Sequence, residues 1–187
     1  MTATAKKQAT YEDLYSLPEN MVGEIIDGEL ITSPRPAPKH ARAASKLGGY
    51  LDGPFDTGSG GGPGGWFILI EPELQLGPQT MVPDIAGWKK ERLLHPPDGN
   101  SITVAPDWIC EIISPSTVRT DRIKKMPRYA EHQVKHAWLI DPIAKTLEVF
   151  KLDQGGWKLF ATHSDTDKVR VEPFDSIEID LSYLWWD

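Results

Sequence analysis

An apolar run at residues 108–113 contains one acidic residue in its middle. The run consists of Trp108, Ile109, Cys110, Glu111, Ile112 and Ile113. A short, nearly continuous apolar run of this kind favours a strand that is buried on both faces. Removing an ionised carboxylate from water is costly unless a cation or a set of hydrogen bonds replaces the solvent. We therefore expect Glu111 to have a partner elsewhere in the fold.

The pattern before this run predicts a hairpin, a helix and two strands. The turn dipeptide Asp27-Gly28 lies between two short strand-like runs within residues 23–33. Small and apolar residues at helical spacing predict a helix over about residues 38–51. Strands are predicted over 66–76, with a break at Pro72, and over 80–88. The residues expected on the buried face of the helix are Ala41, Ala44, Leu47 and Leu51.

The pattern after this run predicts a second helix and several strands. Residues 121–132 have a helical pattern, but Pro127 predicts a kink or a later start. Strand-like runs follow at 136–142, 146–153 and 156–162, with one more in the tail.

The order of these elements indicates an α+β or mixed α/β fold of one domain, residues 1–187. Residues 1–10 are expected to form a flexible leader, and the segment 53–65, rich in Gly and Pro, is expected to be a loop.

Composition limits the class of protein. One cysteine excludes an internal disulfide and a Cys-cluster zinc site, and no apolar run approaches the roughly 20 residues that span a bilayer. The N-terminus has no signal-peptide pattern, so a soluble cytoplasmic protein is expected. The net charge of −7 by itself argues against a nucleic-acid partner.

Two basic segments weaken the argument against a nucleic-acid partner. Residues 116–136 carry six Lys/Arg against two acids, and residues 35–51 carry four Lys/Arg and no acid. Such runs are often only solvated helix faces, but they are also the candidates for phosphate contacts. The candidate nucleic-acid-binding residues are Lys39, His40, Arg42, Lys46, Arg119, Arg122, Lys124 and Arg128.

Three acids lie within strand-like runs: Glu73, Asp84 and Glu111. On neighbouring core strands they would repel one another and raise one another's pKa values unless a divalent cation neutralised them. Carboxylate oxygens suit Mg²⁺ or Mn²⁺ better than zinc. For Glu73, a strand acid that faces solvent is an equal alternative.

A lysine is expected to face the end of the strand that carries Glu111. Asp121, Lys125 and Tyr129 lie at i, i+4 and i+8 on one face of the predicted helix. Lys125 could stabilise charge on a phosphate, or simply form an i, i+4 ion pair with Asp121.

These residues resemble the Uma-type endonuclease family of the PD-(D/E)XK nuclease superfamily. The resemblance rests on "VPDIAGW", "PDWICEIISPST" and "DRIKKMPRYAEHQVKHAWLIDP" and covers nearly the whole chain. It implies a restriction-endonuclease-like core, a central mixed sheet flanked by helices. It also implies Asp84 and Glu111 as ligands of Mg²⁺ or Mn²⁺.

The chain departs from the superfamily pattern at one position. The pattern has a lysine two residues after the acid, where this chain has Ile113. Related families place the lysine on the following helix, so Lys125 is the expected substitute; Lys124 lies off the face shared by Asp121 and Tyr129. Asp107, part of a second Pro-Asp pair, lies on the same strand as Glu111 and is therefore rejected in favour of Asp84.

Two further residues are expected at or near the site. The resemblance to the family implies that Glu24 reaches the site from the N-terminal part of the chain. Ser114 is expected to be a strand-end or cap hydroxyl rather than a nucleophile.

The sequence thus predicts a metal-dependent endonuclease that acts on DNA, with RNA left open, and a homodimer. A nuclease-like module that binds nucleic acid or a protein without cleavage is the alternative, and a purely structural module is a second one.

Overall fold

The strand that carries Glu111 lies inside the fold. In this computed structural model, which describes residues 8–95 and 97–186, β8 (Trp108–Ile112) is buried at all five positions. It pairs with β6 (Ile85–Lys89) antiparallel and with β9 (His136–Asp141) parallel. Side chains alternate between the two faces of a strand. Cys110 and Ile112 join one hydrophobic cluster, and Ile109 joins the other.

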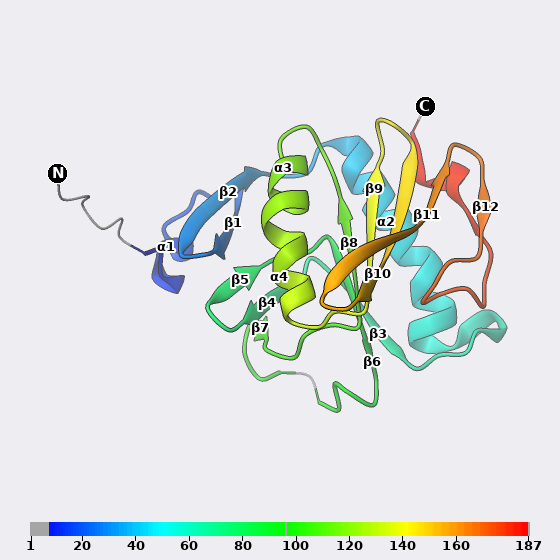
Figure 1. Cartoon of the computed structure of the whole chain (residues 1–187), viewed down its shortest axis with the longest axis horizontal. Coiled ribbons are helices and arrows are strands. Elements are labelled where there is room, and N and C mark those ends of the chain that lie inside the picture. The colour runs from blue at the N-terminus through cyan, green and yellow to red at the C-terminus, as the bar shows by residue number, and fades with distance from the viewer. Residues whose placement is uncertain (1–7, 96, 187) are drawn as a thin grey trace.

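A six-stranded mixed sheet surrounds β8 (Figure 1). Its order is β11-β10-β9-β8-β6-β3, and β8–β9 is its parallel pair. The remaining strands are β3 (Trp66–Ile70), β10 (Thr146–Asp153) and β11 (Gly156–Ser164). The parallel pair requires a crossover connection, which the second predicted helix supplies. The expected central mixed sheet is therefore confirmed.

The crossover helix begins earlier than its pattern suggested and contains a π-helical turn. It consists of α3 (Val118–Thr120), η3 (Asp121–Lys125) and α4 (Met126–Glu131), which follow one another without a break (Figure 1). The N–H of Met126 bonds to the carbonyl of Asp121, five residues back. Pro127, which has no N–H to donate, directly follows this π-helical turn. The expected later start is therefore wrong.

A second sheet lies beside the first and is built mainly from the N-terminal half. Its order is β2-β1-β5-β4-β7. The strands are β1 (Met21–Ile26), β2 (Glu29–Pro34), β4 (Glu73–Leu76), β5 (Gln79–Met81) and β7 (Ser101–Ile102). The hairpin β1–β2 turns at Asp27 and Gly28, both with positive φ, as the dipeptide predicted.

The chain crosses between the two sheets twice at the same place. β3 ends and β4 begins around Glu71-Pro72, and β5 ends and β6 begins around residues 82–84. The run 80–88, predicted as one strand, is therefore two strands in different sheets. The N–H of Glu71 donates to the carbonyl of Asp84 at 3.0 Å. This junction places Asp84 ahead of β6 rather than inside a strand.

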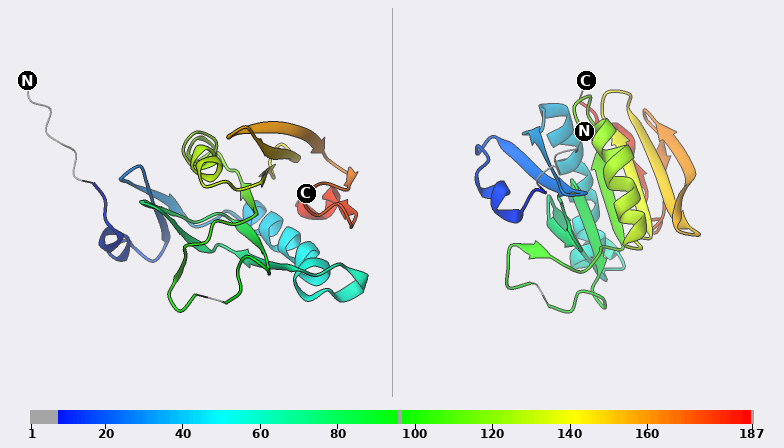
Figure 2. Two further views of the ribbon diagram at one scale, coloured as in Figure 1. Left: turned by 60° about the horizontal axis from the view of Figure 1, so that its bottom comes forward. Right: turned by 60° about the vertical axis from the view of Figure 1, so that its left-hand side comes forward.

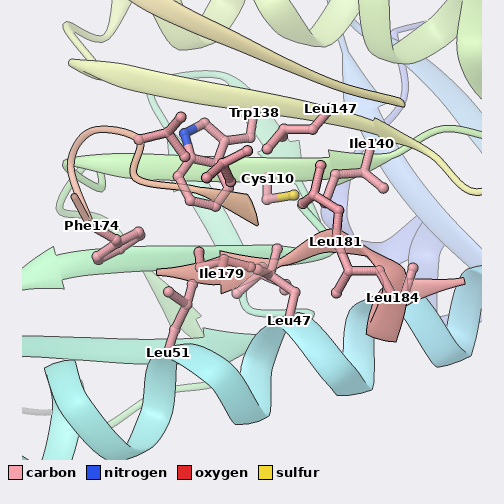
Figure 3. Packing of buried hydrophobic residues seen from close by; sticks show 14 of the residues in the cluster. Leu47, Leu51, Cys110, Trp138, Ile140, Leu147, Phe174, Ile179, Leu181 and Leu184 are labelled. Carbon is pink, nitrogen blue, oxygen red and sulfur yellow. The ribbon is translucent and has the colours of Figure 1, made fainter. Parts of the chain in front are cut away.

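Helices cover opposite faces of the six-stranded sheet. α2 (Pro38–Leu51) packs on the face of Cys110, while α4 packs on the other face with Ile109 (Figure 2). Leu47 and Leu51 point from α2 into the cluster, as Figure 3 shows. The predicted helix bounds are confirmed. Its buried face includes His40 and Ala43, however, and Ala41 is exposed.

The remaining elements are short. They are α1 (Tyr11–Tyr15), η1 (Asp52–Thr57), η2 (Ser59–Gly61), β12 (Lys168–Val169), β13 (Ile179–Asp180) and η4 (Leu181–Leu184). The expected loop 53–65 is thus helical in its first part, where Phe55 is buried. Residues 1–7 of the expected leader lie outside the described residues. Among the described residues, no helix is both long and apolar enough to cross a membrane.

Candidate active site

Lys125 is buried between four oxygen-bearing groups. Its Nζ lies 2.9 Å from Oε1 of Glu111 and 3.0 Å from Oε1 of Glu24. It donates to the carbonyl of Val82 at 2.9 Å, and Oδ1 of Asp121 lies 3.8 Å away. Lys125 thus has one hydrogen bond, to the carbonyl of Val82, and close ion pairs with Glu111 and Glu24. Burial disfavours the charge, but Glu111 and Glu24 outweigh it and raise the pKa of Lys125 well above its ordinary value.

Glu111 points from β8 toward the crossover helix. Its Oε1 accepts a hydrogen bond from the hydroxyl of Tyr129 at 2.6 Å as well as the contact from Lys125. Oε2 has no hydrogen-bond partner within residues 8–95 and 97–186, and Glu111 lines a pocket. Burial raises the pKa of Glu111 well above its ordinary value; Lys125 opposes this shift. The partner that the sequence analysis required is therefore Lys125 together with Tyr129.

The turn before β6 holds Asp84 next to Glu111. Oδ2 of Asp84 accepts the backbone N–H of Ile112 at 2.7 Å, and Oδ1 lies 3.1 Å from Nε2 of His40. Ile112 is the neighbour of Glu111 on β8, so the hydrogen bond brings the two acids to the same end of adjacent strands. Asp84 is more accessible than Glu111: 16% of its side chain is exposed, against 2%.

Two further acids complete the cluster around Lys125. Oε1 of Glu24, on β1, also accepts the backbone N–H of Val82 at 2.8 Å. Asp121 is buried, and burial raises its pKa to about 6, although Lys125 and the hydroxyl of Thr117 oppose the shift. Glu24 and Asp121 therefore reach the site from the second sheet and from the crossover helix, as expected.

These side chains line one pocket of about 280 Å³. Five carboxylates line it, against the permanent cations Lys125 and Arg35. The excess of negative charge favours an additional cation. The acidic lining residues are Glu24, Glu71, Asp84, Glu111 and Asp121, and the neutral ones include Ser114, Ser116 and Thr117.

The donor set fits a hard divalent cation, although it is not a closed cage. Among the described residues, no group of three or more His, Cys, Asp or Glu side chains is arranged to hold a metal. Asp84 and Glu111 offer carboxylate oxygens to the same pocket. Mg²⁺ usually binds through one or two carboxylates and keeps waters and substrate phosphates as its other ligands. These two residues therefore match the smaller donor set that Mg²⁺ uses.

Glu73 is not brought to this pocket. Its Oε1 accepts the hydroxyl of Tyr11 at 2.6 Å, and it is absent from the pocket lining. Of the two alternatives for Glu73, the metal ligand is corrected, because the side chain is directed from β4 toward Tyr11 on α1. Glu71, two residues earlier, lines the pocket instead. The sequence signal that could have found it is the Glu-Pro pair at which the strand breaks.

The contacts of Ser114 and Asp107 agree with the roles that the sequence predicted for them. The hydroxyl of Ser114 accepts the backbone N–H of Thr117 at 3.3 Å, as a cap hydroxyl would, and also bonds to the hydroxyls of Ser116 and Thr117. Asp107 pairs with Arg92 at 2.7 Å and accepts the N–H of Lys89, so its rejection agrees with the geometry.

Most of the predicted phosphate-binding side chains already have protein partners. Arg42 donates to the carbonyl of Trp185, Lys124 pairs with Glu29, and His40 contacts Asp84. Arg122 pairs with Glu148, and Arg128 pairs with Asp27 and Glu131. Lys39, Lys46 and Arg119 are exposed and have no ion pair within the described ranges. Arg35, which lines the pocket and donates to the carbonyl of Glu19, was not among the predicted residues.

The whole fold is similar to that of a solved protein. It matches the crystal structure of "a putative nuclease belonging to DUF820" from Anabaena variabilis ATCC 29413, with a TM-score of 0.74 and 26% sequence identity. The match covers 94% of this chain and 97% of that chain. A search of curated proteins found no match.

The sequence itself matches a family model over almost its full length. The match includes every residue that contributes a side chain to the site described above, from Glu24 to Tyr129. The resemblance inferred from the motifs is thereby confirmed: the chain belongs to the Uma2 family, described as "Putative restriction endonuclease", whose model matches residues 9–182.

Proposed function

We propose that this protein is a divalent-metal-dependent endonuclease that hydrolyses phosphodiester bonds of DNA. The observation that carries the proposal is the arrangement of Asp84, Glu111 and Lys125 around one acidic pocket. The family and the similar solved structure support a nuclease; the metal and the DNA substrate are our inference.

Each residue of the site has a separate proposed role. Asp84 and Oε2 of Glu111 would hold the metal, which supplies an activated water and offsets charge on the phosphate when bound. Tyr129 and Lys125 hold Oε1 of Glu111 and so orient its other oxygen. Because the side chain of Lys125 is only 3% exposed and its Nζ lies against Glu24, Glu111 and the carbonyl of Val82, Lys125 acts on a phosphate through its charge in this arrangement, rather than through a direct hydrogen bond.

Cleavage of supercoiled plasmid in Mg²⁺ or Mn²⁺ tests the proposal. We expect wild type to nick and linearise the plasmid, and Asp84→Asn and Glu111→Gln to lose at least about 100-fold in rate. Glu73→Gln is the matched control, because it makes the same acid-to-amide change outside the pocket. Metal-dependent cleavage that survives Asp84→Asn and Glu111→Gln would refute the assignment of the site.

A nuclease-like module without cleavage is the second candidate. The burial of Lys125 against two carboxylates and the lack of a three-residue metal cluster among the described residues favour it. The plasmid assay separates the two candidates when it is combined with DNA binding at low salt. Binding without cleavage in either metal would select the module.

A homodimer is part of the proposal, because two active sites related by a two-fold axis provide the simplest way to cut both strands. Light scattering coupled to size exclusion measures it directly. A monomer at the concentration used for cleavage would contradict this part alone.

A further inference from the structure

His40 lies on α2, on the opposite side of Asp84 from the backbone of β8. It is 8% exposed, and its Nε2 lies 3.1 Å from Oδ1 of Asp84. From the sequence, His40 is only a candidate for phosphate contact, and a lone histidine more often has no such role. The nuclease proposal above gives it no role, although it lines the same pocket.

Asp84 depends on this contact because of its position in the chain. It precedes β6, at the junction of the two sheets; its carbonyl accepts the N–H of Glu71, which holds the backbone, but the orientation of its carboxylate depends on the contacts of the side chain itself. Two donors hold its carboxylate: the N–H of Ile112 on Oδ2 and the imidazole of His40 on Oδ1. With both donors in place, each oxygen has one defined partner and the plane of the carboxylate is set.

Nδ1, the other ring nitrogen of His40, indicates the role of the imidazole. Nδ1 is buried and has no hydrogen-bond partner among the described residues. An unsatisfied buried polar atom costs free energy, and an apolar side chain beside Ala43 and Leu47 would avoid that cost. What the imidazole adds at this position is the donor to Asp84. Because Nε2 is turned onto Asp84 and Nδ1 is buried, neither nitrogen is placed to bind phosphate.

We propose that His40 is a positioning residue that orients Asp84 and so raises the affinity of the pocket for a divalent cation. The inference rests on the proposed function, since it concerns the carboxylate assigned to the metal. Hydrogen-bond partners of metal ligands typically change metal affinity by about 10–100-fold when they are removed.

Calorimetric titration of Mn²⁺ into two variants of similar polarity tests the inference. His40→Gln places an amide nitrogen near the position of Nε2, whereas His40→Asn places it near Nδ1, out of reach of Asp84. We expect Asn to weaken Mn²⁺ binding by about 10–100-fold and Gln to keep most of the affinity. His95→Ala, in an exposed loop, is the histidine control and is expected to match wild type.

The outcomes are distinguishable. Equal Mn²⁺ affinity of the Asn and Gln variants, with wild type binding normally, would overturn the role of His40 and leave the nuclease proposal standing. Failure of wild type itself to bind Mn²⁺ would overturn both. Thermal melts in the absence of metal show whether each variant is folded. A purely structural role would lower the melting temperature without separating Gln from Asn in Mn²⁺ affinity.

Discussion

Nζ of Lys125 lies 2.9 Å from Oε1 of Glu111, although one residue comes from a π-helical turn and the other from a buried strand. Ile113, which holds the position of the superfamily lysine, is buried in the cluster that contains Ile109, Met126 and Tyr129. The crossover helix packs against this face of the sheet. The lysine that contacts Glu111 therefore comes from the crossover helix, whereas the superfamily motif places it two residues after the acid on the same strand.

Replacing Lys125 by Met tests how much the buried ion pair matters. The substitution leaves Glu24 and Glu111 without their shared cation, and breaking a buried pair from one side costs about 3–5 kcal/mol. We expect urea unfolding to show a loss of that size. Lys124→Met is the neighbouring control, because its pair with Glu29 is partly exposed and is worth at most about 1 kcal/mol. An equal loss of unfolding free energy in the two variants would show that the buried ion pairs of Lys125 contribute no more than the exposed pair of Lys124.

Removing the hydroxyl of Tyr129 tests the second donor to Glu111. Hydrogen bonds to charged groups contribute about 1.5–3 kcal/mol, so Tyr129→Phe should lower the free energy of unfolding by about that amount. Tyr183→Phe, at an exposed tyrosine, should change it by less than about 0.5 kcal/mol. If Phe is tolerated at 129 without loss, Lys125 alone satisfies Oε1.

Asp121 should make stability fall as pH rises through its titration. Its pKa is about 6 in the folded protein against an ordinary value of 3.8. The folded state therefore binds the proton more tightly than the unfolded chain, and stability from this group decreases between about pH 4 and pH 6. The shift corresponds to about 3 kcal/mol.

Urea unfolding of wild type and Asp121→Asn across pH 4–7 measures this effect. Relative to the Asn variant, wild type should lose stability up to about pH 6 and then remain level. A difference between the two proteins that stays constant with pH would contradict the burial of an ionisable Asp121.

Divalent metal should stabilise the folded protein. A ligand that binds only the folded state at 100 times its dissociation constant adds about 2.7 kcal/mol. We expect Mn²⁺ to raise the melting temperature of wild type and of Glu73→Gln, and chelation by EDTA to reverse the increase. Asp84→Asn should show little increase, because it loses a pocket carboxylate. An equal increase in all three proteins would mean that the metal binds elsewhere.

The unpaired basic side chains should carry the salt dependence of DNA binding. Each phosphate contact contributes about 0.9 to the slope of log affinity against log salt. Replacing Lys39, Lys46 and Arg119 by Ala should reduce the slope by up to about 2.7, as measured by fluorescence anisotropy with Ca²⁺ in place of Mg²⁺.

The control for this measurement replaces Arg122, Lys124 and Arg128, which are already paired with carboxylates. It should change the slope less. A larger decrease of the slope in this control than in the first variant would place the DNA against Arg122, Lys124 and Arg128.

The sequence by itself determined the elements whose signals are local. Spacing of apolar residues predicted α2 at about its observed bounds, and Asp27-Gly28 predicted the first hairpin. The acid inside an apolar run identified Glu111 as a residue that needs a partner, and the i, i+4, i+8 face pointed to Lys125 and Tyr129. These inferences succeeded because helix periodicity, turn conformation and the cost of burying charge are properties of short segments.

Only the tertiary structure decided which acids meet. Glu71 and Glu73 are two residues apart, yet the break at Pro72 sends β3 and β4 to different sheets, and only Glu71 lines the pocket. In the same way, Lys39 and His40 are neighbours on α2, yet His40 contacts Asp84 and Lys39 is exposed. Local pattern does not contain this information, because the point where a chain changes sheets depends on how distant strands pair and pack.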